Sequence, residues 1–288
     1  MKTGLVLEGG GMRGIYTAGV LDVLDEAGLR PCFDGVIGVS AGAVHGCSFV
    51  SGQRGRSIRY FTKYCRDRGF MSVYSLLTTG NAVGEKLCYH DIPERLDPFD
   101  NEAFMASPTA FYVGVTNLET GQAEYPRITD MRKQMDYMRA SASMPYVSRI
   151  VTLEGKPYLD GGIADSVPLA AFERMGYARN VVVLTKEDGF KHRSDNIPLL
   201  NGRYRKYPRF LETLAKRVEL CEAEERYIQQ AVAEGRAFAI RPSRKPEIGR
   251  LERNPERLNA LYALGKQDAA AALPALPRFL EANGERRA

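Results

Sequence analysis

The first half of the chain alternates short apolar runs with longer segments in which apolar residues recur every three or four positions. The short runs, such as residues 5–7, contain no polar position, which is typical of strands buried on both faces of a sheet. The longer segments have the spacing of helices with one buried face. This alternation predicts an α/β protein, a three-layer α/β/α sandwich around a central, mostly parallel sheet.

The predicted elements extend to about residue 188, where the pattern changes. We expect strands at residues 5–7, 36–39, 111–116, 150–153, 157–160 and 181–184, and helices at 15–27, 41–50, 131–143 and 170–175. Beyond them come a basic loop (190–209) and two amphipathic helices (210–234 and 254–272). The sequence therefore predicts a main domain over residues 4–188 and a helical C-terminal appendage over residues 189–288, whose role the sequence leaves open.

Composition narrows the classes of function. The chain has 288 residues, of which 44% are hydrophobic and 26% charged, as in folded globular proteins. A net charge of +5 is too small to favour a nucleic-acid partner. The three histidines lie far apart and the five cysteines form no C-x-x-C pair, so we expect no metal and a reducing compartment such as the cytoplasm. No targeting segment is evident, and the uncharged stretch 35–53 is too rich in glycine and serine for a membrane span.

A glycine-rich loop follows the first predicted strand. It reads Gly9-Gly10-Gly11-Met12-Arg13-Gly14 and precedes a predicted helix, so its backbone N–H groups are placed to bind an anion. The glycines also fit the dinucleotide-binding pattern G-x-G-x-x-G, which requires an acidic residue at the end of the second strand. Asp34 precedes that strand instead of ending it, and no Gly-Lys-Ser/Thr follows the loop as a Walker motif requires.

A nucleophile motif follows the second predicted strand. Gly38-Val39-Ser40-Ala41-Gly42 is G-x-S-x-G at a strand-to-helix junction, the context in which a sharp turn exposes a serine hydroxyl. His45 lies five residues along the helix and should point away from that hydroxyl, while His90 and His192 occupy polar or irregular stretches. The remaining candidate base is Asp160, which ends a predicted strand and precedes Gly161 and Gly162.

The order G-G-G-x-R-G, G-x-S-x-G and D-G-G resembles that of the patatin-like phospholipases, serine lipid acyl hydrolases that use a Ser–Asp dyad. Residues 140–145 (Ala-Ser-Ala-Ser-Met-Pro) resemble the family's small-residue segment ending in proline. The resemblance implies Ser40 as nucleophile and Asp160 as proton acceptor. It also implies an oxyanion hole from the amides around Gly10 and Gly11, with Arg13 beside them, and no cofactor.

The function expected from the sequence is therefore hydrolysis of an acyl ester of a phospholipid or acylglycerol. Three alternatives stay open: an esterase for a soluble substrate, a non-catalytic lipid-binding protein and a dinucleotide-binding oxidoreductase. Residues 191–217 carry eight lysines and arginines against two acidic residues. With Tyr204, Tyr207 and Phe210 among them, this segment is either a docking site for an anionic membrane surface or a solvated basic loop. The expected location is the cytoplasm, with peripheral membrane attachment as an option; the sequence does not define the oligomeric state.

Overall fold

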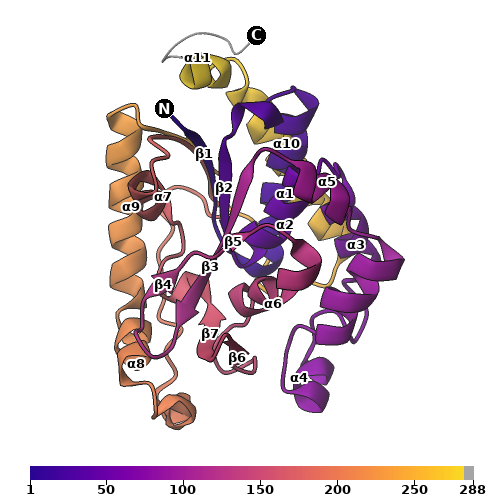
Figure 1. The fold of residues 1–288 in the computed structure, drawn as a ribbon, viewed down its shortest axis with the longest axis vertical. Helices are drawn as coiled ribbons and strands as arrows, with labels where there is room; N and C mark the ends of the chain where they lie inside the picture. Colours follow the sequence, from indigo (N-terminus) through magenta and orange to yellow (C-terminus); the bar gives the residue numbers. More distant parts are fainter. Residues whose placement is uncertain (282–288) are drawn as a thin grey trace.

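The computed structural model describes residues 1–281 and is built around one mixed sheet (Figure 1). The main strand order is β6-β7-β3-β2-β1-β8-β9. The neighbours in the path β3-β2-β1-β8-β9 pair in parallel. The strands of the hairpin β6–β7 are antiparallel to each other, and β7 is antiparallel to β3. The strands are β1 (Thr3–Leu7), β2 (Gly35–Val39), β3 (Ala110–Asn117), β4 (Ala123–Glu124), β5 (Arg127–Ile128), β6 (Val151–Leu153), β7 (Lys156–Asp160), β8 (Arg179–Val183) and β9 (Ala237–Ile240).

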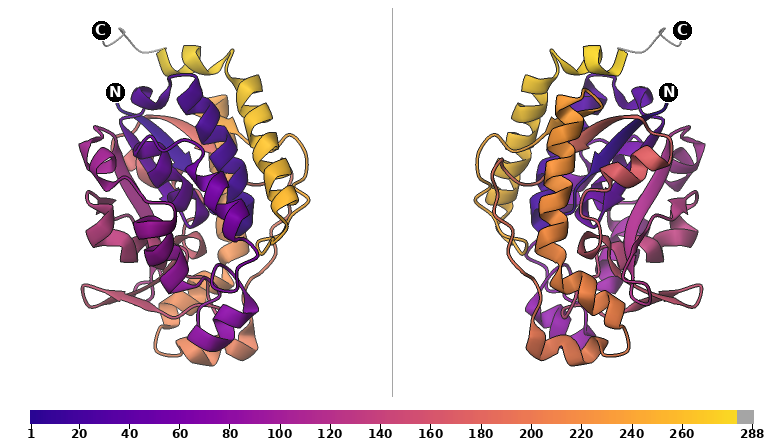
Figure 2. Two further views of the ribbon diagram at one scale, coloured as in Figure 1. Left: turned by 90° about the vertical axis from the view of Figure 1, so that its right-hand side faces the viewer. Right: turned by 90° about the vertical axis from the view of Figure 1, so that its left-hand side faces the viewer.

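Helices cover both faces of this sheet, which confirms the predicted three-layer α/β/α architecture. One layer contains α1, α2, α3 and α10, and the opposite layer contains α7 and α9 (Figures 1 and 2). The α-helices are α1 (Ile15–Glu26), α2 (Ala41–Val50), α3 (Arg56–Tyr64), α4 (Val73–Thr79), α5 (Asn101–Ala106), α6 (Met131–Ser141), α7 (Leu169–Arg174), α8 (Pro208–Ala215), α9 (Arg217–Ala233), α10 (Pro255–Ala272) and α11 (Leu276–Glu281). The shorter turns are the 3-10 helices η1 (Gly11–Gly14), η2 (Arg30–Cys32), η4 (Gly161–Ile163) and η5 (Pro198–Tyr204), and the π-helix η3 (Leu87–Leu96).

The continuous apolar runs of the central strands fill both sides of the sheet. In β1, Leu5 and Leu7 belong to the core beneath α1 and α2, whereas Val6 belongs to the core beneath α7 and α9. Successive side chains of a strand point to opposite faces, so a strand covered by helices on both sides requires apolar residues at every position. This is the physical reason why these strands could be predicted from sequence.

The C-terminal region, predicted to be a helical appendage, is closely joined to the core. Strand β9, which the sequence pattern did not reveal, pairs in parallel with β8 and extends the sheet. Helix α10 lies along α1, and the Tyr262 hydroxyl donates a 2.6 Å hydrogen bond to Asp22 there. The predicted helix 210–234 is divided at Lys216 into α8 and α9, and the predicted loop 190–209 contains η5. Residues 282–288 of the predicted region lie outside the described residues.

Two of the aromatic side chains expected at a membrane headgroup layer are instead part of the core. Tyr204 and Phe210 are fully buried, with ring centroids 5.0 Å apart, in a cluster with Leu118, Leu159 and Leu214. The prediction for these two rings was wrong, because they anchor η5 and α8 to the end of the sheet. The exposed apolar side chains of this region come from residues just before them, Ile197, Leu199 and Leu200.

Candidate active site

Ser40 occupies the sharp turn between β2 and α2. Its backbone has φ 53° and ψ −123°, a region that residues other than glycine rarely adopt. Such a conformation persists only where the surrounding structure imposes it, and it is the geometry of a nucleophile elbow. Ser40 is only 7% exposed, and it lines a cavity at the carboxyl end of the parallel strands. Open α/β sheets commonly bind ligands at this edge.

Sheet register brings Asp160 to the level of Ser40. Val39 pairs with Gly114 of β3, and the next residue of β3, Val115, pairs with Asp160 of β7. Ser40 and Asp160 therefore lie on either side of β3 at the same height, although 120 positions separate them in the sequence. The close approach requires a glycine after the aspartate, because a Cβ on Gly161 would lie 2.3 Å from the Gly114 carbonyl oxygen.

The Asp160 carboxyl group is buried and held by several neighbours. Its Oδ1 accepts a 2.8 Å hydrogen bond from the Gly162 amide, and its backbone N–H donates to the Ser143 carbonyl. Burial raises the pKa of Asp160 above the ordinary value of 3.8, while hydrogen bonds from Gly162 and the Ser40 side chain, and the charges of Arg217 and Arg250, offset part of this rise. A carboxylate with a raised pKa is a better proton acceptor.

The glycine-rich loop passes over the same cavity. Gly9, Gly10, Gly11 and Arg13 line it, whereas Met12 and Gly14 are buried beneath the loop. The Met12 amide donates to the Arg250 carbonyl at 3.1 Å, so it is already engaged. Within residues 1–281, the amides of Gly10 and Gly11 have no protein acceptor. These two N–H groups are therefore available to a developing oxyanion.

Gly11 has a backbone conformation that explains why a glycine stands there. Its φ is +57°, and a Cβ at this position would lie 2.8 Å from the Arg250 carbonyl oxygen. Both the turn and the contact with the C-terminal region depend on the missing side chain.

One supporting residue, Ser141, was not assigned a role from sequence. Its hydroxyl accepts a 2.8 Å hydrogen bond from the Ser40 amide and donates a 2.6 Å hydrogen bond to the Gly114 carbonyl. Ser141 thus links the strained turn to the neighbouring strand. The signal in the sequence was the small-residue segment 140–145, whose resemblance to the family pattern did not by itself reveal this contact.

Two cavities of different character meet at Ser40. The charged cavity, of about 280 Å³, contains Asp160 and four cationic side chains, Arg13, Lys186, Arg217 and Arg250, together with apolar residues such as Ile163 and Leu214. The other, of about 80 Å³, is an apolar recess; Gly11, Ser40 and Met144 line both cavities. The walls of the recess include Val44, Tyr60, Phe61, Phe70, Met71 and Val83.

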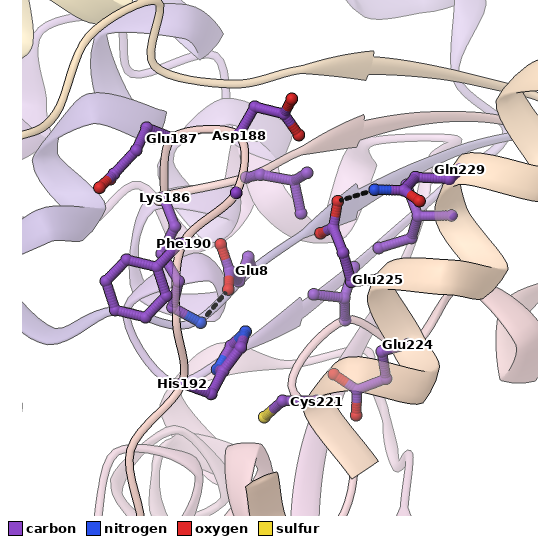
Figure 3. A pocket seen from close by; sticks show the side chains of 14 residues that line it. Glu8, Lys186, Glu187, Asp188, Phe190, His192, Cys221, Glu224, Glu225 and Gln229 are labelled. Carbon is purple, nitrogen blue, oxygen red and sulfur yellow. Dashed lines mark hydrogen bonds and ion pairs between the residues drawn. The ribbon is translucent and has the colours of Figure 1, made fainter. Parts of the chain in front are cut away.

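None of the three histidines lies beside Ser40. His45 is buried against Phe61, with ring centroids 5.0 Å apart, and burial lowers its pKa to about 3. His90 is exposed and pairs with Glu94. His192 lines a separate cavity with Glu8, Lys186, Cys221 and Glu224, as Figure 3 shows.

The positions of two acidic residues, Asp34 and Glu8, complete the description of the site. Asp34 concerns the dinucleotide alternative, and Glu8 fixes the position of Lys186. Asp34 accepts the Thr3 amide at the start of β1, away from the end of β2 where an acidic residue would bind a ribose. Glu8 is buried and forms a 2.6 Å ion pair with Lys186, an interaction visible in Figure 3. Within the described part of the chain, no cluster of His, Cys, Asp and Glu could hold a metal ion.

A serine on a strained strand-to-helix turn, with a buried carboxylate across the neighbouring strand, is an arrangement typical of serine hydrolases. The profile of the patatin-like phospholipase family matches residues 5–173. The chain therefore belongs to the patatin-like phospholipase family, as the sequence motifs indicated. A second profile, of a domain of unknown function (DUF6363), matches residues 207–281.

The chain matches only part of the length of its individual relatives. The chain is 32% identical over 189 residues to the uncharacterized protein YjjU of Escherichia coli, which covers 64% of this chain and 52% of YjjU. It is 29% identical over 187 residues to the lysophospholipase nte1 of Emericella nidulans, covering 60% of this chain and 11% of that protein. The crystal structure of VipD from Legionella pneumophila covers 95% of this chain and 67% of that chain, with a TM-score of 0.45 and 14% identity.

Within residues 1–281, no helix combines the length and the apolar composition that a membrane crossing requires.

Proposed function

We propose that this protein is a serine lipid acyl hydrolase that cleaves acyl ester bonds of phospholipids or acylglycerols through Ser40 and Asp160. The observation that carries the proposal is the placement of the Ser40 elbow and the buried Asp160 carboxylate at one level across β3. A serine hydroxyl is a weak nucleophile unless a neighbouring group accepts its proton. A structural role alone gives no reason for the strained turn and the buried carboxylate to meet in a cavity.

In the acylation step, Ser40 Oγ attacks the carbonyl carbon of the ester and its proton passes to Asp160. The negative charge on the former carbonyl oxygen is stabilised by the Gly10 and Gly11 amides, each such donor being worth about 10²- to 10³-fold in rate. When the tetrahedral intermediate collapses, the alcohol leaves with the proton from Asp160. Water then attacks the acyl group on Ser40, again with Asp160 as proton acceptor, which releases the fatty acid and restores the serine.

The two cavities support an acyl ester substrate with one apolar and one polar part. The aromatic and aliphatic walls of the recess suit a hydrocarbon chain, because burying apolar surface is favourable by about 25 cal/mol per Å². The charged cavity then receives the alcohol part of the ester. These apolar walls favour an ester whose acyl part is a hydrocarbon chain over one whose acyl part is polar.

Exposed apolar residues beside the site support docking on a lipid surface. Helix α4 exposes Val73, Tyr74 and Leu77, and the start of η5 exposes Ile197, the residue before it, and Leu199 within it. Ile197 also lines the charged cavity, and α4 follows Met71 of the apolar recess. Such residues would enter the membrane interface on either side of the site, assisted by basic side chains such as Arg205 and Lys206.

The proposal is tested with a fluorophosphonate probe and a short-chain aryl ester. We expect wild-type protein to be labelled at Ser40 and to hydrolyse the ester, and Ser40→Ala to lose both properties while keeping its fold. The matched control is Ser48→Ala on the same helix α2. Turnover that persists in pure Ser40→Ala protein would overturn the assignment. Absence of labelling and of turnover in the wild type would favour a non-catalytic lipid-binding protein.

A further inference from the structure

The C-terminal region reaches into the candidate active site at two places. Arg217, the first residue of α9, donates through Nε to the Gly162 carbonyl at 2.7 Å, directly beside the Asp160–Gly162 turn. Arg250 contributes its carbonyl group to the Met12 amide and its guanidinium to the cavity. Both residues fall within the 207–281 segment, for which the family match gives no function.

The two guanidinium groups share a single carboxylate. Asp195, in the segment between β8 and η5, accepts hydrogen bonds from Arg250 Nη1 at 2.9 Å and Nη2 at 3.2 Å, and it also pairs with Arg217. This fork of two parallel N–H groups on a carboxylate is the geometry with which arginine also binds phosphate. Asp195 therefore occupies a site whose shape and charge fit a phosphate group.

The surrounding charges favour an anion at this place. Arg13 and Lys186 line the same cavity as Arg217 and Arg250, so four cations stand near the carboxylates of Asp160 and Asp195, and one of them, Lys186, is also paired with Glu8. Burial and the proximity of Arg250 lower the pKa of Arg13, although an arginine remains charged. The 17-residue helix α9 begins at Arg217, and the partial positive charge of its N-terminus adds to these cations. A cationic side chain at a helix N-terminus is unfavourable for the helix itself, which points to a role outside it.

We propose that Arg217 and Arg250 form the subsite for the phosphate of the substrate, and that Asp195 fills this subsite in the free protein. This inference rests on the proposed function and refines it: the preferred substrate is a phosphate-bearing acyl ester, a phospholipid or lysophospholipid. The phosphate displaces Asp195 from the guanidinium pair and leaves the ester between the Ser40 hydroxyl and the Gly10 and Gly11 amides. The role of the C-terminal region is then to complete the cavity with its cationic wall.

The test compares a lysophospholipid with a monoacylglycerol of the same chain length, both below their aggregation concentrations. In Arg250→Gln we expect the ratio of kcat/KM for the lysophospholipid to that for the monoacylglycerol to fall about ten- to hundred-fold, because a charge-assisted hydrogen bond is lost. In Asp195→Asn the ratio should rise, because the internal competitor is removed. The control is Arg226→Gln, an exposed arginine on helix α9, which should leave the ratio unchanged.

An unchanged ratio in Arg250→Gln would overturn the subsite, and so would an equal loss for both substrates, which is the result of a purely structural role. A fall of the ratio in Asp195→Asn would assign that residue to substrate binding and overturn its role as competitor.

Calorimetry separates this inference from the proposed function, because it does not depend on turnover. We expect sn-glycero-3-phosphocholine to bind the wild type, to bind Asp195→Asn more tightly and to bind Arg250→Gln at least ten-fold more weakly. Inorganic phosphate distinguishes a lipid headgroup from free phosphate as the ligand: tighter binding of inorganic phosphate than of the glycerophosphodiester would overturn the headgroup assignment. If Ser40→Ala retained esterase activity, the proposed function would fail, and these binding constants would still decide whether the phosphate subsite exists.

Discussion

The backbone amide of Ser40 donates a 2.8 Å hydrogen bond to the hydroxyl of Ser141, a buried residue 101 positions away. That hydroxyl in turn donates to the Gly114 carbonyl of β3. The strained turn at Ser40 is therefore supported by a side chain from α6, and its position relative to β3, and hence to Asp160, depends on this link.

Replacing Ser141 with Ala should weaken both the fold and the chemistry. The change leaves the Ser40 amide without its acceptor, and an unsatisfied buried polar group costs about 1–3 kcal/mol. We expect kcat to fall more than KM rises, because the displaced group is the nucleophile. Ser143→Ala is the matched control, since the Arg139 carbonyl is the one hydrogen-bond partner of the Ser143 hydroxyl within residues 1–281. Equal effects of the two variants on kcat would contradict the role assigned to Ser141.

Asp160→Asn should abolish most activity and at the same time stabilise the fold at neutral pH. Loss of the proton acceptor is expected to slow the chemical step by about 10²- to 10⁴-fold. Because burial raises the pKa of Asp160, its ionisation at neutral pH costs stability, and a neutral amide removes that cost. Thermal unfolding should show a higher Tm for the variant, and a lower Tm would contradict the pKa argument.

The pH profile of the wild type gives a second measurement on the same residue. Activity should fall on the acid side as Asp160 becomes protonated, with a midpoint above 3.8, the ordinary value for the group. Alanine at His45, His90 or His192 should leave this acid-side fall of activity unchanged. If any of these variants lost as much activity as Ser40→Ala, a histidine base would replace the dyad.

Glu224 should make the stability of the protein depend on pH. Burial and the nearby Asp165 raise its pKa to about 8, from an ordinary value of 4.5. The folded state thus holds a proton that the unfolded state releases, so this contribution is fully present below about 4.5 and is lost as pH rises through about 8. In chemical denaturation, Glu224→Gln should show a higher free energy of unfolding at pH 8 and a flatter pH profile. Glu222→Gln, an exposed neighbour on α9, should retain the wild-type profile.

Membrane docking should depend on the exposed apolar side chains as well as on basic charge. Leu77 is 81% exposed and Leu199 is 92% exposed. Burying each leucine in an interface is worth about 1.5–3 kcal/mol, so Leu77→Ser with Leu199→Ser should lower vesicle binding at least ten-fold. Val232→Ser on α9 is the control. Co-sedimentation with neutral and anionic vesicles would measure the effect, and unchanged binding would exclude this surface.

The basic side chains should contribute separately from the leucines. Arg205→Gln with Lys206→Gln should reduce binding to anionic vesicles alone, and high salt should have the same effect. Arg203 is a poor choice for this test, because it donates to the carbonyl groups of Tyr146 and Ser148. Equal binding of wild type to neutral and anionic vesicles would restrict docking to the apolar side chains.

The sequence by itself determined the α/β layers and indicated the two residues proposed as the dyad. Buried parallel strands require apolar residues at every position, so β1, β2 and β8 were evident as continuous runs. Ser40 and Asp160 stood in motifs whose order along the chain resembles the family pattern. These are local properties: a strand, a turn and the few residues around it carry the whole signal.

Tertiary structure decided what depends on register and on contacts between distant segments. Only the pairing of β2, β3 and β7 sets Ser40 beside Asp160, and only the packing of α6 brings Ser141 beneath the turn. The sequence predicted that the basic segment 191–217 forms one exposed surface. In the structure, however, Tyr204 and Phe210 are buried and Arg217 lines the cavity. Strand β9 was missed because four residues at a sheet edge carry too little pattern, and its pairing partner is more than fifty positions away. Side-chain direction and strand pairing are set by the whole core, which no local window of sequence contains.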